Sequence, residues 1–137
     1  MDKGREVRAI LSPEDVEDDV LRPRVAREWR DRWSHCFVAA VGGIEAGLIL
    51  FDFYRETLDG SIQQVFVLDR FRKLRIATEL MECAEAELKK LGATRARLNP
   101  YALGRERGDP DTPTLIRWYS SLGFIADETT ITMTKVL

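Results

Sequence analysis

Residues 65–80 decide the fold, and they read Val-Phe-Val-Leu-Asp-Arg-Phe-Arg-Lys-Leu-Arg-Ile-Ala-Thr-Glu-Leu. The pattern indicates an apolar strand, a short basic turn and the first turns of an amphipathic helix. A helix N-terminus leaves backbone N–H groups unpaired, and the helix dipole adds partial positive charge there, so a phosphate or pyrophosphate binds readily. Arg70, Arg72, Lys73 and Arg75 crowd the same turn. The segment therefore predicts a phosphate site, with a solvated basic turn as the alternative.

The composition is that of an ordinary globular protein. The chain has 137 residues, of which 45% are hydrophobic and 32% charged, and this predicts one domain over residues 1–137 with its own core. The net charge of −2 provides no general attraction to nucleic acid or to an anionic membrane, so neither is expected as a partner. No signal-peptide pattern opens the chain, which favours a cytoplasmic location. A homodimer is one possible assembly of the chain.

Upstream of the deciding stretch, the sequence predicts a strand, two helices and a hairpin. A short β-type run covers residues 7–11, and the Ser-Pro-Glu-Asp at 12–15 has the N-cap and first-turn residues of a helix start. A second helix is expected over 23–33, with Val25, Trp29 and Trp33 as its apolar stripe and arginines on its other faces. Strands at 36–41 and 44–54 would be joined by a tight turn at Gly42-Gly43, and Asp59-Gly60 would form the next turn before a strand at 61–68.

Downstream, a helix over 72–91 is the clearest element. Its buried stripe would be Ile76, Leu80, Ala84, Leu88 and Leu91, and Gly92 would end it. A strand at 94–98, a polar loop at 99–111, a helix at 112–122 and closing strands at 124–126 and 129–136 complete the chain. The order β-α-α-β-β-β-α-β-α-β-β predicts an α/β protein of the α+β type, with a mixed sheet and helices on its faces.

Two motifs in this order resemble the GCN5-related N-acetyltransferase (GNAT) superfamily. The stretch Val67-Leu-Asp-Arg-Phe-Arg-Lys-Leu-Arg-Ile-Ala77 looks like the family's acyl-CoA pyrophosphate loop, in which Val-x-Pro-x-Tyr-Arg leads into Gln/Arg-x-x-Gly-x-Gly/Ala. The stretch Leu115-Ile-Arg-Trp-Tyr-Ser-Ser-Leu-Gly-Phe124 matches the family's Ala-x-x-Phe-Tyr-x-x-x-Gly-Phe element. The resemblance implies a GNAT-like acyl-CoA N-acyltransferase fold and an N-acetyltransferase that moves an acetyl group from acetyl-CoA to a primary amine by direct attack in a ternary complex.

The resemblance also implies which residues meet acetyl-CoA. Backbone groups of the central strand would pair with the pantetheine amides, and the basic turn and helix start would hold the phosphates. The residues so assigned are Val65, Phe66, Val67, Arg70, Arg72, Lys73, Leu74, Arg75, Ile76, Ala77 and Thr78. Lys73 and Arg75 stand where the family usually has glycine. With a negative φ, Arg75 could point outward and reach a phosphate; alternatively, its side chain obstructs the loop.

The resemblance makes Tyr119 the candidate general acid, which would return a proton to the leaving CoA thiolate. An unperturbed phenol pKa near 10 is close enough to that of a thiol for this role. The alternative is a tyrosine that merely packs beside Trp118. The family's central-strand glutamate is replaced by Gln63 and Gln64, and none of Asp52, Glu56 or Asp69 stands out as a base, so no base is assigned. Cys36 and Cys83 are expected to be packing thiols, His35 a surface or satisfied histidine, and no metal site is expected.

The acceptor is not specified by the sequence. The arginine-rich face of 22–33 would suit an acidic acceptor, although a solvated face is the simpler interpretation. The loop 99–111 would border the acceptor cleft. A second hypothesis, favoured by the missing glycines and glutamate, is a catalytically silent GNAT-fold domain that binds acyl-CoA or a protein partner as a sensor or scaffold.

Overall fold

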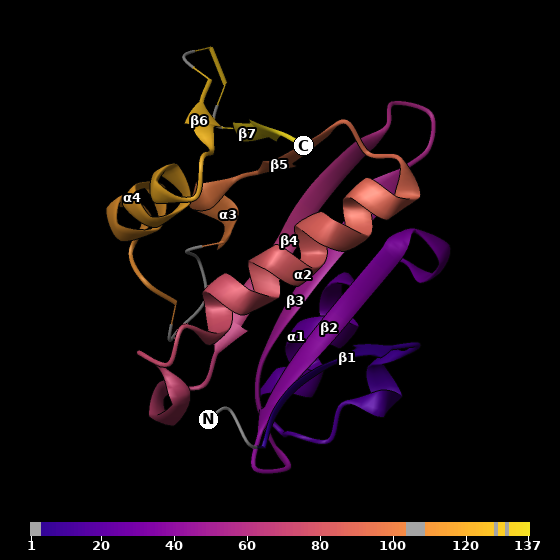
Figure 1. Ribbon diagram of the computed structural model, residues 1–137, viewed down its shortest axis with the longest axis vertical. Coiled ribbons are helices and arrows are strands. Elements are labelled where there is room, and N and C mark those ends of the chain that lie inside the picture. Colours follow the sequence, from indigo (N-terminus) through magenta and orange to yellow (C-terminus); the bar gives the residue numbers. More distant parts are fainter. Residues whose placement is uncertain (1–3, 104–108, 128, 131) are drawn as a thin grey trace.

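The computed structural model of the protein describes residues 4–103, 109–127, 129–130 and 132–137 (Figure 1). The strands are β1 (Arg5–Ile10), β2 (Ser34–Val41), β3 (Ile44–Tyr54), β4 (Asp59–Val67), β5 (Arg95–Leu98), β6 (Ile125–Ala126) and β7 (Met133–Val136). The helices are α1 (Leu21–Glu28), α2 (Ile76–Leu91), α3 (Pro100–Leu103) and α4 (Thr112–Ser121), with 3-10 turns η1 (Pro13–Asp15), η2 (Asp31–Trp33) and η3 (Asp69–Phe71). Within the described residues, no helix is long and apolar enough to span a bilayer.

The strands form one mixed sheet in the order β1-β2-β3-β4-β5-β7-β6. Neighbours are antiparallel except β4 and β5, which run parallel and pair only over Asp59–Ile62 of β4. Beyond that ladder, the edge of β4 at residues 63–67 has no strand partner within the described chain. The β3–β4 register shifts so that Leu50 faces Gln64 and Phe51 faces Ile62, which leaves Gln63 as a bulge. A bulge bends its strand, and here it lies where β4 and β5 separate.

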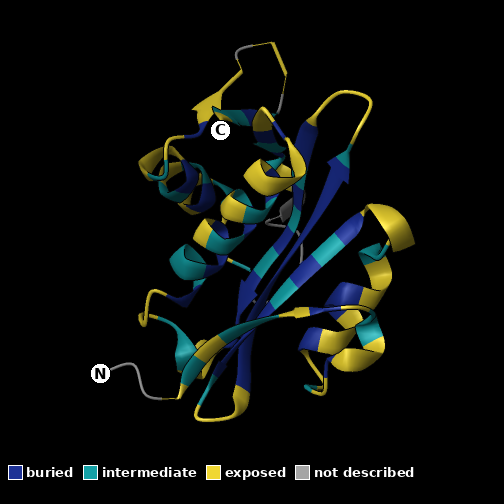
Figure 2. Cartoon of the chain, turned by 45° about the vertical axis from the view of Figure 1, so that its right-hand side comes forward, coloured by how far each residue is buried: buried dark blue, intermediate teal, exposed yellow. Residues whose placement is uncertain are grey.

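Apolar residues pack on both faces of the sheet, and Figure 2 shows buried residues along the central strands. On one face α2 and α4 cover the sheet with Leu80, Leu88 and Tyr119. On the other face α1 packs Leu21 and Val25 against β2, β3 and β4. The mixed sheet with helices on its faces is the predicted α/β fold class, and that prediction is confirmed.

The first two helix predictions are only partly right. The Ser-Pro-Glu-Asp signal produces one 3-10 turn, η1, because the buried Glu45 carboxylate accepts hydrogen bonds from the backbone N–H groups of Glu17 (2.9 Å) and Asp18 (2.7 Å) and holds the chain out of a helix. The second helix, α1, ends at Glu28 and not at residue 33. Trp33 lies in η2 and is 38% exposed, so the predicted Val25–Trp29–Trp33 stripe is wrong.

Two further boundaries differ from the sequence pattern. Asp59 and Gly60 begin β4 and do not form a turn, because Asp59 pairs in the sheet and its buried carboxylate accepts a 2.6 Å hydrogen bond from Arg95. The turn lies at residues 55–58. Helix α2 begins at Ile76, four residues later than predicted, because the preceding turn is left-handed. The Gly42-Gly43 hairpin turn and the Gly92 helix end are confirmed, and all three glycines have positive φ.

Candidate active site

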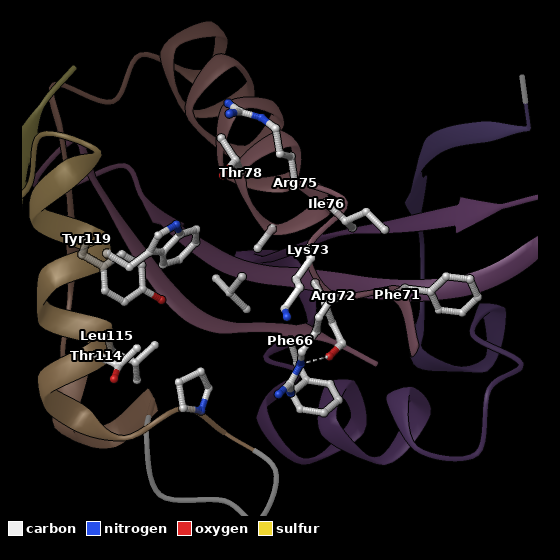
Figure 3. A pocket seen from close by; sticks show the side chains of 15 residues that line it. Phe66, Phe71, Arg72, Lys73, Arg75, Ile76, Thr78, Thr114, Leu115 and Tyr119 are labelled. Atoms are coloured by element: carbon white, nitrogen blue, oxygen red, sulfur yellow. Dashed lines mark hydrogen bonds between the residues drawn. The ribbon is translucent and has the colours of Figure 1, made fainter. Parts of the chain in front are cut away.

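A cavity of about 400 Å³ lies between β4, the start of α2 and helix α4 (Figure 3). Most of the residues predicted for the cofactor line it, and so does the candidate acid: Val65, Phe66, Val67, Arg72, Lys73, Arg75, Ile76, Ala77, Thr78 and Tyr119. Arg70 and Leu74 do not. Arg70 stacks over Phe71 at 4.9 Å, and the Leu74 carbonyl accepts a hydrogen bond from Arg5. The cavity therefore gathers one strand, one helix start and one distant helix around a single space.

The turn that opens α2 has two left-handed residues that are not glycine. Lys73 has a φ of 69° and Arg75 a φ of 62°. The negative φ that would turn the Arg75 side chain outward is therefore not present. Side chains with a Cβ adopt this conformation at a cost of about 1–2 kcal/mol, so the surrounding structure must impose it. The backbone keeps the course that glycine would allow, while the turn carries two exposed cationic side chains.

The start of α2 presents free backbone donors to the cavity. The first intrahelical hydrogen bond is donated by the Glu79 N–H to the Arg75 carbonyl (3.1 Å), so the N–H groups of Ile76, Ala77 and Thr78 lack an intrahelical acceptor. Arg75 is the N-cap residue, and its side chain makes no capping hydrogen bond. Because α2 is 16 residues long, its dipole adds positive potential at these groups. An anion at this point would meet three N–H donors together with Lys73 and Arg75.

The side chain of Arg72 contacts the turn and β4, and these contacts hold the turn in place. Its Nε donates to the Val67 carbonyl (2.9 Å), its guanidinium pairs with Asp69 (3.1 Å), and it lies 5.3 Å over the Phe66 ring. These contacts tie the turn back to β4. Asp69 is therefore already paired and is 89% exposed, which removes it from the list of candidate bases.

The unpaired edge of β4 forms another wall of the cavity. Val65, Phe66 and Val67 line it, and β5 does not reach them. Backbone N–H and C=O groups on such an edge accept an extended ligand as an additional strand. The separation of β4 from β5 thus exposes polar backbone in an otherwise apolar space.

Tyr119 reaches the cavity from α4, and its hydroxyl points into the space in Figure 3. The ring is held by Trp118 and Phe124, with centroids 4.8 and 5.8 Å away, and the residue is only 1% exposed. Within the described residues the hydroxyl makes no hydrogen bond to the protein. Burial raises the pKa of Tyr119 above its usual value, and the Asp109 carboxylate raises it further. The hydroxyl therefore stays protonated at neutral pH and is available as a donor.

A buried polar network that the sequence analysis missed lies beside Tyr119. Arg24 of α1 donates to Gln64 (3.2 Å) and pairs with Asp109 (3.1 Å), and it stacks 3.6 Å over the Phe66 ring. The other end of the Gln64 amide donates to Glu28 (2.6 Å). Arg24 and Glu28 are one helical turn apart on α1, and this spacing was the only local hint of the network in the sequence. Gln64 thus brings an α1 carboxylate to the central strand, where the family glutamate is absent.

The remaining carboxylates and the two cysteines singled out in the sequence lie outside the large cavity. Asp52 is fully buried and accepts hydrogen bonds from Ser34 (2.9 Å) and Tyr54 (3.1 Å), and Glu56 lies in the turn after β3. Burial raises the pKa of Cys36 to about 12, and it also raises the pKa of Cys83. Both cysteines are free thiols, as expected. Among the described residues, no group of three or more His, Cys, Asp or Glu side chains could hold a metal ion.

Most of the arginines of 22–33 are bound to the protein itself. Arg22 donates to the backbone carbonyls of Val16 and Glu14, Arg24 belongs to the buried network, and Arg32 lies 4.5 Å over the Trp33 ring. Arg30 lies 4.0 Å from Asp52. The expectation that this face binds an acidic acceptor gains no support from these contacts. Of the loop 99–111, residues 104–108 lie outside the described part of the chain.

The sequence matches a known protein family over most of its length. The profile of the acetyltransferase (GNAT) family matches residues 5–124. This range includes β4, the basic turn, α2 and α4, and therefore every wall of the cavity. No curated protein matches the sequence.

Solved structures share the fold at low sequence identity. An IAA acetyltransferase from Bacillus cereus has a TM-score of 0.70 at 15% identity, over 97% of this chain and 99% of the other. The PaiA N-acetyltransferase from Thermoplasma acidophilum, in complex with coenzyme A, has a TM-score of 0.67 at 14% identity, over 96% and 99%. A GNAT family acetyltransferase from Elizabethkingia anophelis with acetyl-CoA bound has a TM-score of 0.67 at 12% identity, over 98% and 99%. At these identities the likeness supports the fold alone.

Proposed function

This chain belongs to the acetyltransferase (GNAT) family, and we propose that it transfers an acetyl group from acetyl-CoA to the nitrogen of an amine by direct attack. A C–N bond forms and the C–S bond of the thioester breaks. The ammonium form of the acceptor loses two protons in total, of which one ends on the CoA sulfur and one in solvent. The protein must therefore hold the thioester, deprotonate the amine and protonate the thiolate.

The donor would occupy the cavity between β4, α2 and α4. Its pyrophosphate would accept hydrogen bonds from the N–H groups at the start of α2, with Lys73 and Arg75 adding charge. Its pantetheine arm would lie along the open edge of β4 at Val65–Val67 and hydrogen-bond there as an added strand. Two solved structures of the same fold carry CoA or acetyl-CoA by name, which supports this assignment of the ligand.

Tyr119 would protonate the leaving group. The hydroxyl points into the cavity from the wall opposite the start of α2, and its raised pKa keeps the proton on the oxygen. A raised pKa also makes it a weaker acid than a free phenol. Its hydrogen bond to the sulfur therefore stabilises the thiolate as the C–S bond breaks, and the proton follows once charge has developed on sulfur.

One observation carries the proposal: free helix N–H groups, an unpaired strand edge and a protonated tyrosine hydroxyl all face one cavity. A sensor that only bound acyl-CoA would have no use for the third of these, so the silent alternative is not favoured. The single domain over 1–137, the cytoplasmic location and a homodimer remain predictions.

The donor site is tested by calorimetric titration with acetyl-CoA. We expect saturable binding that weakens as salt increases, since phosphates and cationic side chains meet in the site. Lys73→Met and Arg75→Met should each weaken binding by about five-fold, equivalent to about 1 kcal/mol for an exposed charge pair. Arg117→Met removes the same charge from an exposed position outside the cavity and should leave affinity unchanged. Absence of binding at millimolar acetyl-CoA would exclude the donor site.

The acid is tested by Tyr119→Phe, which removes only the hydroxyl. We expect kcat to fall by about 100-fold or more while the affinity for acetyl-CoA is retained. Tyr101→Phe is the matched control, because Tyr101 is 48% exposed on α3 and lies outside the cavity. Wild-type turnover in Tyr119→Phe would remove Tyr119 from the mechanism.

A further inference from the structure

A second cavity, of about 230 Å³, lies between the end of α1 and strands β3, β4 and β5. Its polar lining comprises Glu28, Tyr54, Ser61, Gln63, Arg97, Asn99 and Thr132. Ile62 and Gln63 of β4 line this cavity, while Val65, Phe66 and Val67 line the larger one. The two cavities therefore follow each other along β4: the second lies where β4 and β5 part, and the larger one lies along the unpaired edge beyond.

Glu28 and Arg97 are the charged residues in the described lining of this cavity. One Glu28 oxygen accepts the 2.6 Å hydrogen bond from Gln64, and the other has no partner among the described residues. Arg97 is half-buried, yet within the described chain its guanidinium makes no ion pair or hydrogen bond. Its neighbour on the same face of β5, Arg95, is by contrast paired with Asp59 at 2.6 Å. An unpaired guanidinium at a polar cavity wall is a site for an anion that the protein itself does not supply.

The neutral groups of the lining are held in place by their own contacts. The Tyr54 hydroxyl donates to Asp52 (3.1 Å), and Gln63 donates to Ser61 (3.0 Å). Asp52 is fully buried and accepts hydrogen bonds from Tyr54 and Gln63, so its carboxylate stabilises the cavity wall and does not contact a ligand. The cavity is therefore preorganised, with one carboxylate and one guanidinium left available to a ligand.

We propose that this cavity is the acceptor site and that the acceptor is a small amine that also carries a carboxylate, as a free amino acid does. Its ammonium group would face Glu28 and its carboxylate would face Arg97. A simple amine would displace water from Arg97 without replacing its hydrogen bonds, and such a loss is unfavourable in a half-buried site. The proposal rests on the proposed function, since only an acetyltransferase needs an acceptor.

The position of Glu28 also gives the reaction a proton acceptor. The Glu28 carboxylate takes one proton from the ammonium, and the nitrogen lone pair then attacks the thioester carbon presented at the β4 edge. Gln64, fixed between Arg24 and Glu28, acts as a positioning residue for this carboxylate. Glu28 later releases the proton to solvent through the open cavity. The nitrogen loses its second proton as the C–S bond breaks, and the sulfur gains one.

The size of the cavity separates a free amino acid from a polypeptide acceptor. A volume of about 230 Å³ is below the range of about 300–1,000 Å³ typical of sites for drug-sized ligands, so the cavity matches a small molecule. A protein N-terminus would place an amide, and not a carboxylate, one residue from the amine. Arg97 would then have no anionic partner.

The experiment compares matched pairs of acceptors in two independent assays. Each of the standard amino acids is tested beside its α-amide and beside a tripeptide that begins with the same residue. One assay follows release of the CoA thiol with acetyl-CoA present, and the other follows direct binding of the acceptor by calorimetry with CoA present. The variants are Arg97→Met, Arg97→Lys and Glu28→Gln, with Arg117→Met as the control of equal charge change.

We expect at least one free amino acid to bind and to be acetylated with a kcat/KM at least ten-fold above that of its amide. Arg97→Met should lower that kcat/KM by about 30-fold and leave the amide unaffected, and Arg97→Lys should recover part of the loss. Glu28→Gln should lower kcat.

Three results would overturn the proposal: equal rates for acid and amide, transfer to the tripeptide alone, or no binding of any amino acid. If amino acids bind and acetyl-CoA does not, the acceptor site stands and the proposed function fails.

Discussion

The left-handed conformation of Lys73 and Arg75 makes a prediction whose sign is unusual. Replacing an exposed residue by glycine normally destabilises a protein, because glycine loses more backbone entropy on folding, by about 0.5–1 kcal/mol. At Lys73 and Arg75 glycine also relieves the Cβ strain of a positive φ, which is about 1–2 kcal/mol per residue. The difference leaves Lys73→Gly and Arg75→Gly neutral or more stable by up to about 1.5 kcal/mol each.

The control is Ala86→Gly, at an exposed position within α2. It should lower the free energy of unfolding by about 1 kcal/mol. For a urea m-value of about 2 kcal/mol/M, the control midpoint should fall by about 0.5 M, whereas the midpoints of the two turn variants should stay or rise by up to about 0.75 M. The midpoints of all three glycine variants are measured by urea unfolding and compared at a common m-value.

Lys73→Ala and Arg75→Ala separate strain from charge, because each removes the charge and keeps the Cβ. We expect the alanine variants to unfold within about 0.5 kcal/mol of wild type, below their glycine counterparts. Both kinds of variant should weaken acetyl-CoA binding to the same degree, since each loses one cation. If the turn glycines lower stability as much as Ala86→Gly does, the positive φ values are refuted, and with them the account of why α2 begins at Ile76.

Three further predictions concern packing and protonation. Gly47→Ala should destabilise the fold by about 1–3 kcal/mol by urea unfolding, because the added Cβ would lie 2.8 Å from the Phe66 carbonyl oxygen. Burial lowers the pKa of His35, which stacks on Phe51, so the unfolded chain binds a proton more readily near pH 6.5. The stability that His35 contributes is therefore complete above that pH and is lost as pH falls through the lowered folded pKa; unfolding measured from pH 7.5 to 5 should decline less steeply in His35→Gln. Cys36, with a pKa raised to about 12, should resist iodoacetamide at pH 8 in the folded protein and react after unfolding in urea, as followed by mass spectrometry; rapid alkylation of the native state would contradict its burial.

The donor cavity was largely predictable from local pattern. The α2 stripe Ile76–Leu80–Ala84–Leu88 is buried as predicted, whereas Leu91, predicted to belong to it, lies at the helix end and is 38% exposed. Most residues assigned to the cofactor face one space with Tyr119. These predictions work because helix periodicity and turn chemistry act over a few residues. Arg70 and Leu74 were predicted to line the cavity and do not. The backbone path of the turn decides which side chains point inward, and that path depends on the positive φ of Lys73 and Arg75.

The sequence by itself determined the order of the strands and of the longer helices, the basic turn at a helix start and the family. Only the tertiary structure decided what surrounds them. Glu45 stops a helix 28 residues away, Gln64 brings Glu28 to the central strand, and Arg97 lies in the wall of the same cavity as Glu28, without a partner among the described residues. Such contacts join residues far apart in the chain, and they exist only once the sheet has set its register and β4 has parted from β5. No local pattern encodes that separation, which is why the sequence pointed to the donor while the structure was needed to propose an acceptor.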